Sequence, residues 1–291
     1  MEIINSREQM ISIAREISKA QRTIGFVPTM GALHEGHLSL MRAARSQCDV
    51  LVVSVFVNPT QFGPAEDFEK YPRDLESDAA LLTRENVDYL FAPSVADIYA
   101  RGFSTYVTVE GLSEQLEGAS RQGHFRGVAT VVAILLNIVR PDVAFFGQKD
   151  AQQAAVLKRM VRDLAFDTKV VVLPIVREES GLALSSRNAY LGEAEKRSAT
   201  VLHRGLSQAE AAYENGERDG ARLLELVRTT VAAEPLARVD YISLNDAETF
   251  APLEHIAERP ALLSLAVYLG KTRLIDNLLL GETEKQDAAG A

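Results

Sequence analysis

The stretch TIGFVPTMGALHEGHLSL, residues 23–40, decides the fold of this chain. Its first part, TIGFVPT at 23–29, is nearly all apolar, as is typical of a strand covered on both faces. A glycine-containing turn follows and leads into GHLSLMRAARSQ at 36–47, whose apolar spacing predicts a helix. A buried strand, a turn and a helix in direct succession are the first half of a strand–helix–strand unit.

The same alternation continues toward the middle of the chain. Further apolar runs that predict strands are DVLVVSVFV (49–57), VDYLFAP (87–93), DVAFFG (142–147) and TKVVVLPIV (168–176). Helical patterns separate them at 75–86, 128–139 and 149–165. The alternation predicts an α/β fold with a right-handed, doubly wound, Rossmann-like parallel sheet. Ligands of such sheets bind beyond the carboxyl ends of the strands, so we expect functional residues in the loops there.

The pattern changes after residue 176. Two helical stretches at about 193–214 and 219–233 are followed by strand-like runs at 239–246, 261–270 and 271–278, the last two joined as a hairpin at Gly270-Lys271. We therefore predict two domains, 1–176 and a smaller C-terminal α+β domain at 177–291. The polar end, 281–291, is expected to be frayed.

Composition excludes several classes of protein. The 291 residues include 31 Lys plus Arg and 40 Asp plus Glu, and the net charge of −9 argues against a general binder of nucleic acid or of anionic membranes. The single cysteine, Cys48, excludes an intramolecular disulfide and a multi-thiolate metal site. No run of 18 apolar residues and no signal-peptide pattern occurs. We expect a cytoplasmic protein with no membrane span.

The sharpest local motif is His34-Glu35-Gly36-His37, at the start of the helix predicted after the first strand. Gly31 and Gly36 would let the backbone approach a ligand, while the helix-start amides and the two imidazoles would point at an anion. The alternative is that Gly31 only forms a turn and the histidines only cap the helix. A zinc site is disfavoured, because the pattern is not His-Glu-x-x-His and no third ligand is near.

Two further segments offer polar groups for an acid or alcohol substrate. Asn58 and Gln61 lie in the loop at 58–74, after the second predicted strand, where they could bind a hydroxyl or carboxylate. His124 and Arg126 precede an apolar helix and could bind an anionic group. The alternatives are an ordered surface loop for the first pair and helix-start surface charges for the second.

Two more segments are suited to phosphates. Lys149, in FFGQKDAQQ at 145–153, stands where a strand passes into a helix, although a solvated Lys-Asp pair is the alternative. ALSSRN at 183–188 supplies two hydroxyls and a guanidinium that could close over a triphosphate. Together these groups donate to anions and include no Ser-His-Asp or Cys-His set, so we expect charge stabilisation and positioning rather than covalent catalysis.

Seven motifs stand in the order found in one family: PTMGALHEGHLSL, VFVNPTQF, YPRD, GHFRGVATVV, FFGQKD, LALSSRN and TRLIDN. On these residues the chain resembles, over almost its whole length, the pantothenate synthetase (pantoate:β-alanine ligase) family of the His-x-Gly-His nucleotidyltransferase superfamily. The resemblance implies a two-step reaction. ATP and (R)-pantoate give a pantoyl adenylate and pyrophosphate, and β-alanine then displaces AMP to form pantothenate.

The resemblance also assigns residues. ATP would contact the positions Met30, Gly31, Ala32, Leu33, His34, Glu35, Gly36, His37, Gly147, Gln148, Lys149, Asp150, Val176, Leu184, Ser185, Ser186 and Arg187. His34, His37, Lys149 and Arg187 would be catalytic, with His37 as the proton donor. Gln61 and Gln153 would hold pantoate, and Gln61 would also reach β-alanine. The loop at 184–187 would be the counterpart of a mobile nucleotide loop in a C-terminal lid domain.

The partners that the resemblance implies are small molecules, with a homodimer as the assembly. Mg²⁺ would bridge the phosphates through water and substrate oxygens, so no protein metal cage is expected. Two positions depart from the family pattern: Ala151 replaces an aromatic after GQKD, and Gln122-Gly123 replaces a proline before His124. The first could change the nucleotide wall, and the second could loosen the loop that carries His124.

Three other functions fit parts of the sequence. A nucleotidyltransferase that stops at a nucleotide product is disfavoured, because Gln61 and Gln153 suit a hydroxy acid and no extra basic cluster for an acceptor phosphate occurs. A binding module without activity is disfavoured by the presence of His34, His37 and Lys149. A histidine-based zinc hydrolase lacks a third ligand.

Overall fold

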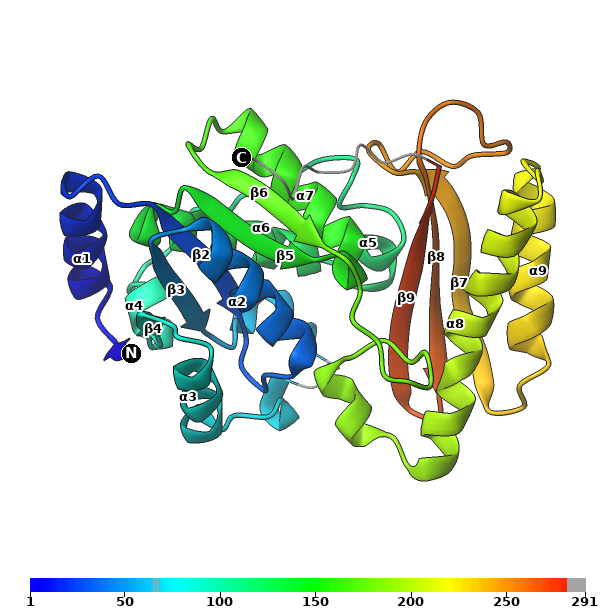
Figure 1. Cartoon of the computed structure of the whole chain (residues 1–291), viewed down its shortest axis with the longest axis horizontal. Helices are drawn as coiled ribbons and strands as arrows, with labels where there is room; N and C mark the ends of the chain where they lie inside the picture. Colours follow the sequence, from blue (N-terminus) through cyan, green and yellow to red (C-terminus); the bar gives the residue numbers. More distant parts are fainter. Residues whose placement is uncertain (65, 67, 282–291) are drawn as a thin grey trace. The chain divides into compact units, whose positions relative to one another are not determined.

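The structure, a computed structural model, describes residues 1–64, 66 and 68–281. The predicted frayed end lies, apart from its first residue, outside the described residues. The chain divides into two compact units, Met1–Val176 and Arg177–Ala291. Each unit has its own sheet and its own hydrophobic core, and each is described by itself (Figure 1).

The first unit is a parallel sheet flanked by helices. Its elements are β1 (Glu2–Ile4), α1 (Arg7–Lys19), β2 (Ile24–Thr29), α2 (Glu35–Gln47), β3 (Val50–Val55), α3 (Leu75–Arg84), β4 (Tyr89–Phe91), α4 (Val95–Ile98), α5 (Glu117–Ser120), α6 (His124–Val139), β5 (Val143–Gly147), α7 (Ala151–Asp163) and β6 (Lys169–Leu173), with the 3₁₀ helices η1 (Pro59–Gln61), η2 (Phe68–Lys70) and η3 (Gln148–Asp150). The strand order is β1-β4-β3-β2-β5-β6, with all pairs parallel.

The predicted fold class is confirmed, and all five strands predicted in this unit are present. Each is shorter than its apolar run, and β6 ends at Leu173, just before Pro174. Residues 2–4 were not predicted as a strand. They form the edge strand β1, which pairs with β4 over three positions and is too short to show a period.

The sheet is covered on both faces. On one face, α2 and α3 contribute Met41, Ala44 and Leu82 to a core that includes Val27 and Leu51 of the strands. On the other face, α6 contacts β2, and α1 and α7 pack against α6 (Figure 1). Burial on both faces explains why the strands are apolar throughout instead of alternating.

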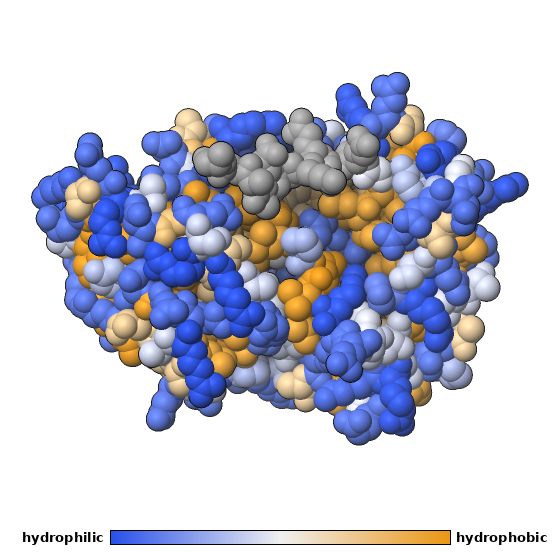
Figure 2. Space-filling view, viewed as in Figure 1, coloured by the Kyte–Doolittle hydropathy of each residue, from blue (hydrophilic) through white to orange (hydrophobic). Residues whose placement is uncertain are grey.

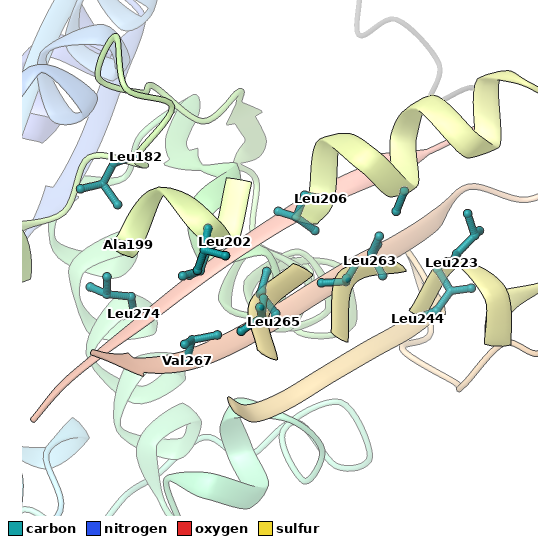
Figure 3. Packing of buried hydrophobic residues seen from close by; sticks show 14 of the residues in the cluster. Leu182, Ala199, Leu202, Leu206, Leu223, Leu244, Leu263, Leu265, Val267 and Leu274 are labelled. Atoms are coloured by element: carbon teal, nitrogen blue, oxygen red, sulfur yellow. The ribbon is translucent and has the colours of Figure 1, made fainter. Parts of the chain in front are cut away.

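The second unit has an antiparallel sheet beside two long helices. Its elements are η4 (Ser186–Tyr190), α8 (Glu193–Glu214), α9 (Gly220–Ala232), β7 (Ala237–Asp246), β8 (Ala261–Leu269) and β9 (Thr272–Leu280), with the strand order β7-β8-β9. The predicted helices, strands and hairpin are confirmed. Leu202 and Leu206 of α8 pack with Leu223 of α9 and with Leu263 and Leu265 of β8 in one core (Figure 3).

The visible face of the molecule in Figure 2 is mainly polar. Hydrophilic side chains prevail on the face drawn in Figure 2, in keeping with the many charged residues in the sequence. In the described part of the chain, no helix combines the length and the apolar character needed to cross a bilayer.

Candidate active site

The strand order places the site. β2 lies between β3 and β5, and the direction of the chain through the sheet reverses at this point, because β4 and β1 continue on one side and β6 on the other. Loops beyond the carboxyl ends of neighbouring parallel strands meet at such a switch point. The loops after β2, β3 and β5 are those that carry His34, Gln61 and Lys149.

The turn between β2 and α2 is held by a buried carboxylate. Gly31 and Ala32 have φ angles of 80° and 51°, in the left-handed region. Asp78 of α3, which is 3% exposed, accepts the amide N–H of Ala32 at 3.0 Å and that of Leu33 at 2.9 Å. A Cβ at position 31 would lie 2.8 Å from Asp78 Oδ2, so glycine is required there by both φ and space. Burial raises the pKa of Asp78, although the two amides oppose this shift.

The two histidines of the motif cap α2. His34 Nδ1 accepts the N–H of Gly36 at 3.1 Å, and His37 Nδ1 accepts the N–H of His34 at 3.3 Å. The two rings lie 4.1 Å apart between centroids. The capping role that the sequence left open as an alternative is therefore present. It uses one nitrogen of each ring and leaves the other for a ligand.

The backbone N–H groups of this turn find acceptors inside the protein. Gly31 N–H donates to Thr29 Oγ1, and the Asp78 and histidine bonds take up the next amides. The amides of Gly31, Ala32, Leu33, His34 and Gly36 therefore have acceptors inside the protein, and a contact of the helix-start amides with an anion stays a prediction.

Both imidazoles are neutral at neutral pH. Burial, with a smaller effect of the Lys149 cation, lowers the pKa of His34 to about 4. Burial, followed by the effect of His34, lowers the pKa of His37 to about 3. Because each Nδ1 accepts an N–H, the single proton of each ring is assigned to Nε2. Within the described residues neither Nε2 has a hydrogen-bond partner, so the pair offers two N–H donors.

Asn58, the N-cap of η1, and Gln61, its last residue, are held rigidly beyond β3. Asn58 is 1% exposed, and its Nδ2 donates to Gln61 Oε1 at 3.0 Å and to Gly127 O of α6 at 3.2 Å. Asn58 Oδ1 accepts from the hydroxyl of Tyr99 at 2.7 Å. Gln61 Nε2 lies 3.1 Å from Met30 Sδ, which joins the loops after β3 and β2. Each amide is therefore oriented before any substrate binds.

His124 holds Gln61 in place through a hydrogen bond to its backbone. Its Nδ1 lies 2.9 Å from Gln61 O and its Nε2 lies 3.0 Å from Arg121 Nη1, while Arg121 pairs with Glu66 at 2.7 Å. Burial, followed by the nearby Arg121 charge, lowers the pKa of His124 to about 4, so the ring is neutral near pH 7. A guanidinium only donates, so Nε2 accepts and Nδ1–H donates to Gln61 O.

Both ring nitrogens of His124 are thus used inside the protein, and a direct contact of His124 with substrate stays a prediction. The bonds of His124 also hold it in place despite the Gln122-Gly123 departure, where Gly123 has a φ of 79°. Arg126, on the exposed side of α6, has its guanidinium 3.8 Å from the ring centroid of Tyr106. Its contact with an anion also stays a prediction.

The segment after β5 carries Lys149 in η3. Its Nζ lies 3.6 Å from Asp150 Oδ1, so the Lys-Asp pair that was the alternative is present, but the Lys149 side chain is only 20% exposed. Both charges affect the pKa of His34, so they lie within electrostatic range of its ring. Gln153 is half-buried in the first turn of α7. This helix starts at Ala151, the other position that departs from the family pattern. Val176 is the last residue of the first unit.

Leu184, Ser185, Ser186 and Arg187 belong to the second unit. Ser185 is the N-cap of η4, and its Oγ accepts the N–H of Arg187 at 3.3 Å. All four residues are partly buried.

Four residues of the site were missed by sequence reasoning: Asp78, Tyr99, Arg121 and Gly127. One signal was available, because Asp78 stands four positions before the buried Leu82, on the apolar face of a predicted helix. A carboxylate there needs donors. Gly127 lies inside the quoted motif GHFRGVATVV and Arg121 stands two positions before it, but nothing in the sequence showed what they contact.

Known proteins resemble this chain over nearly its whole length. The family model described as pantoate-β-alanine ligase matches residues 2–279. The pantothenate synthetase of Acidobacterium capsulatum is 62% identical over 262 residues, which are 90% of this chain and 87% of that protein.

Two solved structures are also similar. Pantothenate synthetase from Thermus thermophilus superimposes with a TM-score of 0.92 at 46% identity, covering 97% of this chain and 100% of that one. A structure from Francisella tularensis, described as a complex with β-γ ATP and β-alanine, gives a TM-score of 0.79 at 39% identity over 96% of this chain and 97% of that one.

Proposed function

Because the chain belongs to the pantoate-β-alanine ligase family, and so forms pantothenate from pantoate and β-alanine with ATP, we propose that its reaction passes through a pantoyl adenylate. The observation that carries the proposal is the pairing of two neutral Nε2–H donors with Lys149 at the switch point of the sheet. These groups stabilise charge without attacking it, which suits a substrate carboxylate as the nucleophile.

In the first step, a pantoate carboxylate oxygen attacks the α-phosphorus of ATP, and the bond from that phosphorus to the bridging oxygen breaks. Pyrophosphate leaves with the bonding electrons. His34 and His37 donate hydrogen bonds to phosphate oxygens through Nε2–H, and Lys149 balances the growing negative charge. With a pKa of about 3, His37 is suited to donate a hydrogen bond at neutral pH rather than to act as a cationic acid.

In the second step, the neutral amine of β-alanine attacks the acyl carbon, AMP leaves, and the nitrogen loses a proton. Gln61 and Gln153 hold pantoate in this proposal, and Asn58 fixes the Gln61 amide. His124 fixes the position of Gln61 through its hydrogen bond to the Gln61 carbonyl, and Arg126 attracts the anionic substrate. Rigid amides favour the reaction by orienting the two reactants rather than by changing their charge.

The nucleotide site of this proposal also includes Gly147, Gln148, Asp150, Val176 and the loop at 184–187, with Arg187 on the phosphates. Mg²⁺ enters on the nucleotide, with water completing its shell. In the described part of the chain, no three His, Cys, Asp or Glu side chains gather closely enough to hold a metal. On the family resemblance, we also propose that the protein is cytoplasmic and that it forms a homodimer. Light scattering of the purified protein tests the dimer.

Oxygen transfer tests the adenylate. Pantoate labelled with ¹⁸O in its carboxylate is incubated with ATP, Mg²⁺ and β-alanine, and the AMP is examined by mass spectrometry. An adenylate requires one labelled oxygen in AMP, because the attacking oxygen stays on the phosphorus when the amide forms. Label in pyrophosphate or inorganic phosphate, with none in AMP, contradicts the proposal.

A further inference from the structure

Residues 177–183 form a small hairpin immediately before the loop at 184–187. Arg177 and Ala183 form an antiparallel bridge, and Glu178 N–H donates to Leu182 O at 2.9 Å. Gly181 N–H closes the turn on Glu178 O at 2.8 Å. The hairpin is therefore the base from which the loop at 184–187 extends.

One guanidinium ties this hairpin to β9. Arg177 Nη1 and Nη2 donate to the two carboxylate oxygens of Asp276 at 2.6 and 2.9 Å, and Arg177 Nη1 also donates to Gly181 O at 3.2 Å. The side chain of Asp276 is 3% exposed and that of Arg177 is 20% exposed. A two-point ion pair at this burial holds its partners in a fixed geometry.

The other contacts of the hairpin and of the loop are also with residues of the second unit. Leu182 before the loop and Leu191 after it both belong to the core of the second unit (Figure 3 shows Leu182). Asn188 Nδ2 donates to Ala183 O at 3.0 Å. Gly181 has a φ of 89°, and a Cβ there would lie 2.4 Å from His203 Cδ2 of α8. The hairpin is thus fixed between β9 and α8.

We propose that Arg177 and Asp276 are positioning residues, which act through the hairpin to hold Ser185, Ser186 and Arg187 in the conformation that binds the nucleotide. Asp276 lies in TRLIDN, a quoted motif for which the proposed reaction has no role. The inference rests on the proposed function of the loop at 184–187. It gives a role to an ion pair that is buried in the second unit.

Three variants test the proposal. Asp276→Asn breaks the pair, and the double variant Arg177→Met with Asp276→Leu replaces it by apolar groups, which is often neutral for stability. Asp240→Asn is the matched control, because it breaks the 2.8 Å pair with Arg273 on the same sheet. For each variant we would measure hydrogen exchange of the peptide 177–190, thermal unfolding, and the KM values for ATP and pantoate.

In the double variant, exchange of the peptide 177–190 and the KM for ATP should each rise at least about tenfold, the factor for one lost hydrogen bond to a charged group. The KM for pantoate and the unfolding midpoint should change little. Unchanged exchange, or an unchanged KM for ATP, in a folded variant overturns the proposal, as does the same response in Asp240→Asn. If the double variant does not fold, Arg177→Lys takes its place, because it keeps the charge but loses the two parallel hydrogen bonds to Asp276. The same measurements and the same outcomes then apply. A wild-type protein without pantoate-dependent activity refutes the proposed function instead, and the exchange data still decide whether the pair fixes the hairpin.

Discussion

Gly127→Ala should disable the pantoate side of the site while leaving the protein folded. Gly127 lies in α6 where the helix meets η1, and its carbonyl oxygen accepts from Asn58. A Cβ at position 127 would lie 2.4 Å from Thr60 O and 2.7 Å from the Gln61 nitrogen, whereas ordinary contacts begin at 3.4 Å. Both obstructing groups are backbone, so they cannot rotate away.

The size of the effect follows from how far these two distances fall below 3.4 Å. Restoring ordinary contact distances moves η1 by about 1 Å, and a displacement of that size in a substrate-positioning group costs about 10²-fold in rate. Stability changes less. The alanine gains about 1 kcal/mol of helix propensity, and overpacking costs about 1–3 kcal/mol, so the net loss is about 2 kcal/mol or less.

The assay is kcat/KM for pantoate, with the KM for ATP and the urea unfolding curve measured on the same preparations. We expect a fall of about 10² in kcat/KM for pantoate, while the KM for ATP stays within about threefold. Gly192→Ala is the matched control, because its Cβ would meet only Glu195 Oε2, at 3.7 Å. A folded Gly127→Ala enzyme with wild-type kcat/KM for pantoate would refute the reasoning.

Three other substitutions test separate parts of the site. Lys149→Met should lower pantoate-dependent pyrophosphate exchange by about 10²-fold through lost charge stabilisation, with Lys158→Met of α7 as control; exchange within about threefold of wild type counts against it. Asp78→Ala should lower the free energy of unfolding in urea by about 2–4 kcal/mol, because two amides lose a charged acceptor, and a change below about 0.5 kcal/mol contradicts this. His124→Asn keeps an N–H for Gln61 O but does not titrate. Below pH 6.5 this histidine binds a proton in the unfolded chain, whereas His124 in the folded protein, with a pKa of about 4, does not. The contribution of His124 to the free energy of unfolding is therefore full above pH 6.5 and is lost as the pH falls. The loss between pH 7.5 and 5 should therefore be about 2 kcal/mol smaller in the variant, and an equal loss in both proteins refutes the assignment.

The sheet could be predicted because burial on both faces leaves a direct trace in the sequence. Runs such as 49–57 are apolar throughout, and strand β3 lies inside that run. The position of the site followed from the same rule, since Asn58 and Lys149 stand just beyond strand ends. Residues 2–4 could not be predicted as a strand, because they pair with β4 at the edge of the sheet and three residues show no period.

The internal hydrogen bonds of the site could not be predicted. Asp78 bonds to an amide 46 positions earlier in the chain, and His124 bonds to a carbonyl 63 positions earlier. Such partners are fixed by tertiary packing, not by local pattern. The two histidines were recognised as functional candidates, but only the geometry shows that one nitrogen of each caps the helix and that the proton lies on the other.

Exchange of labelled pyrophosphate into ATP, measured with Mg²⁺ and pantoate but without β-alanine, tests the central claim most directly. The account predicts exchange that depends on pantoate, because adenylate formation is reversible before the amine arrives. Adding β-alanine should then stop the exchange and yield AMP and pantothenate in equal amounts. Folded protein that binds ATP but shows no pantoate-dependent exchange would contradict the account.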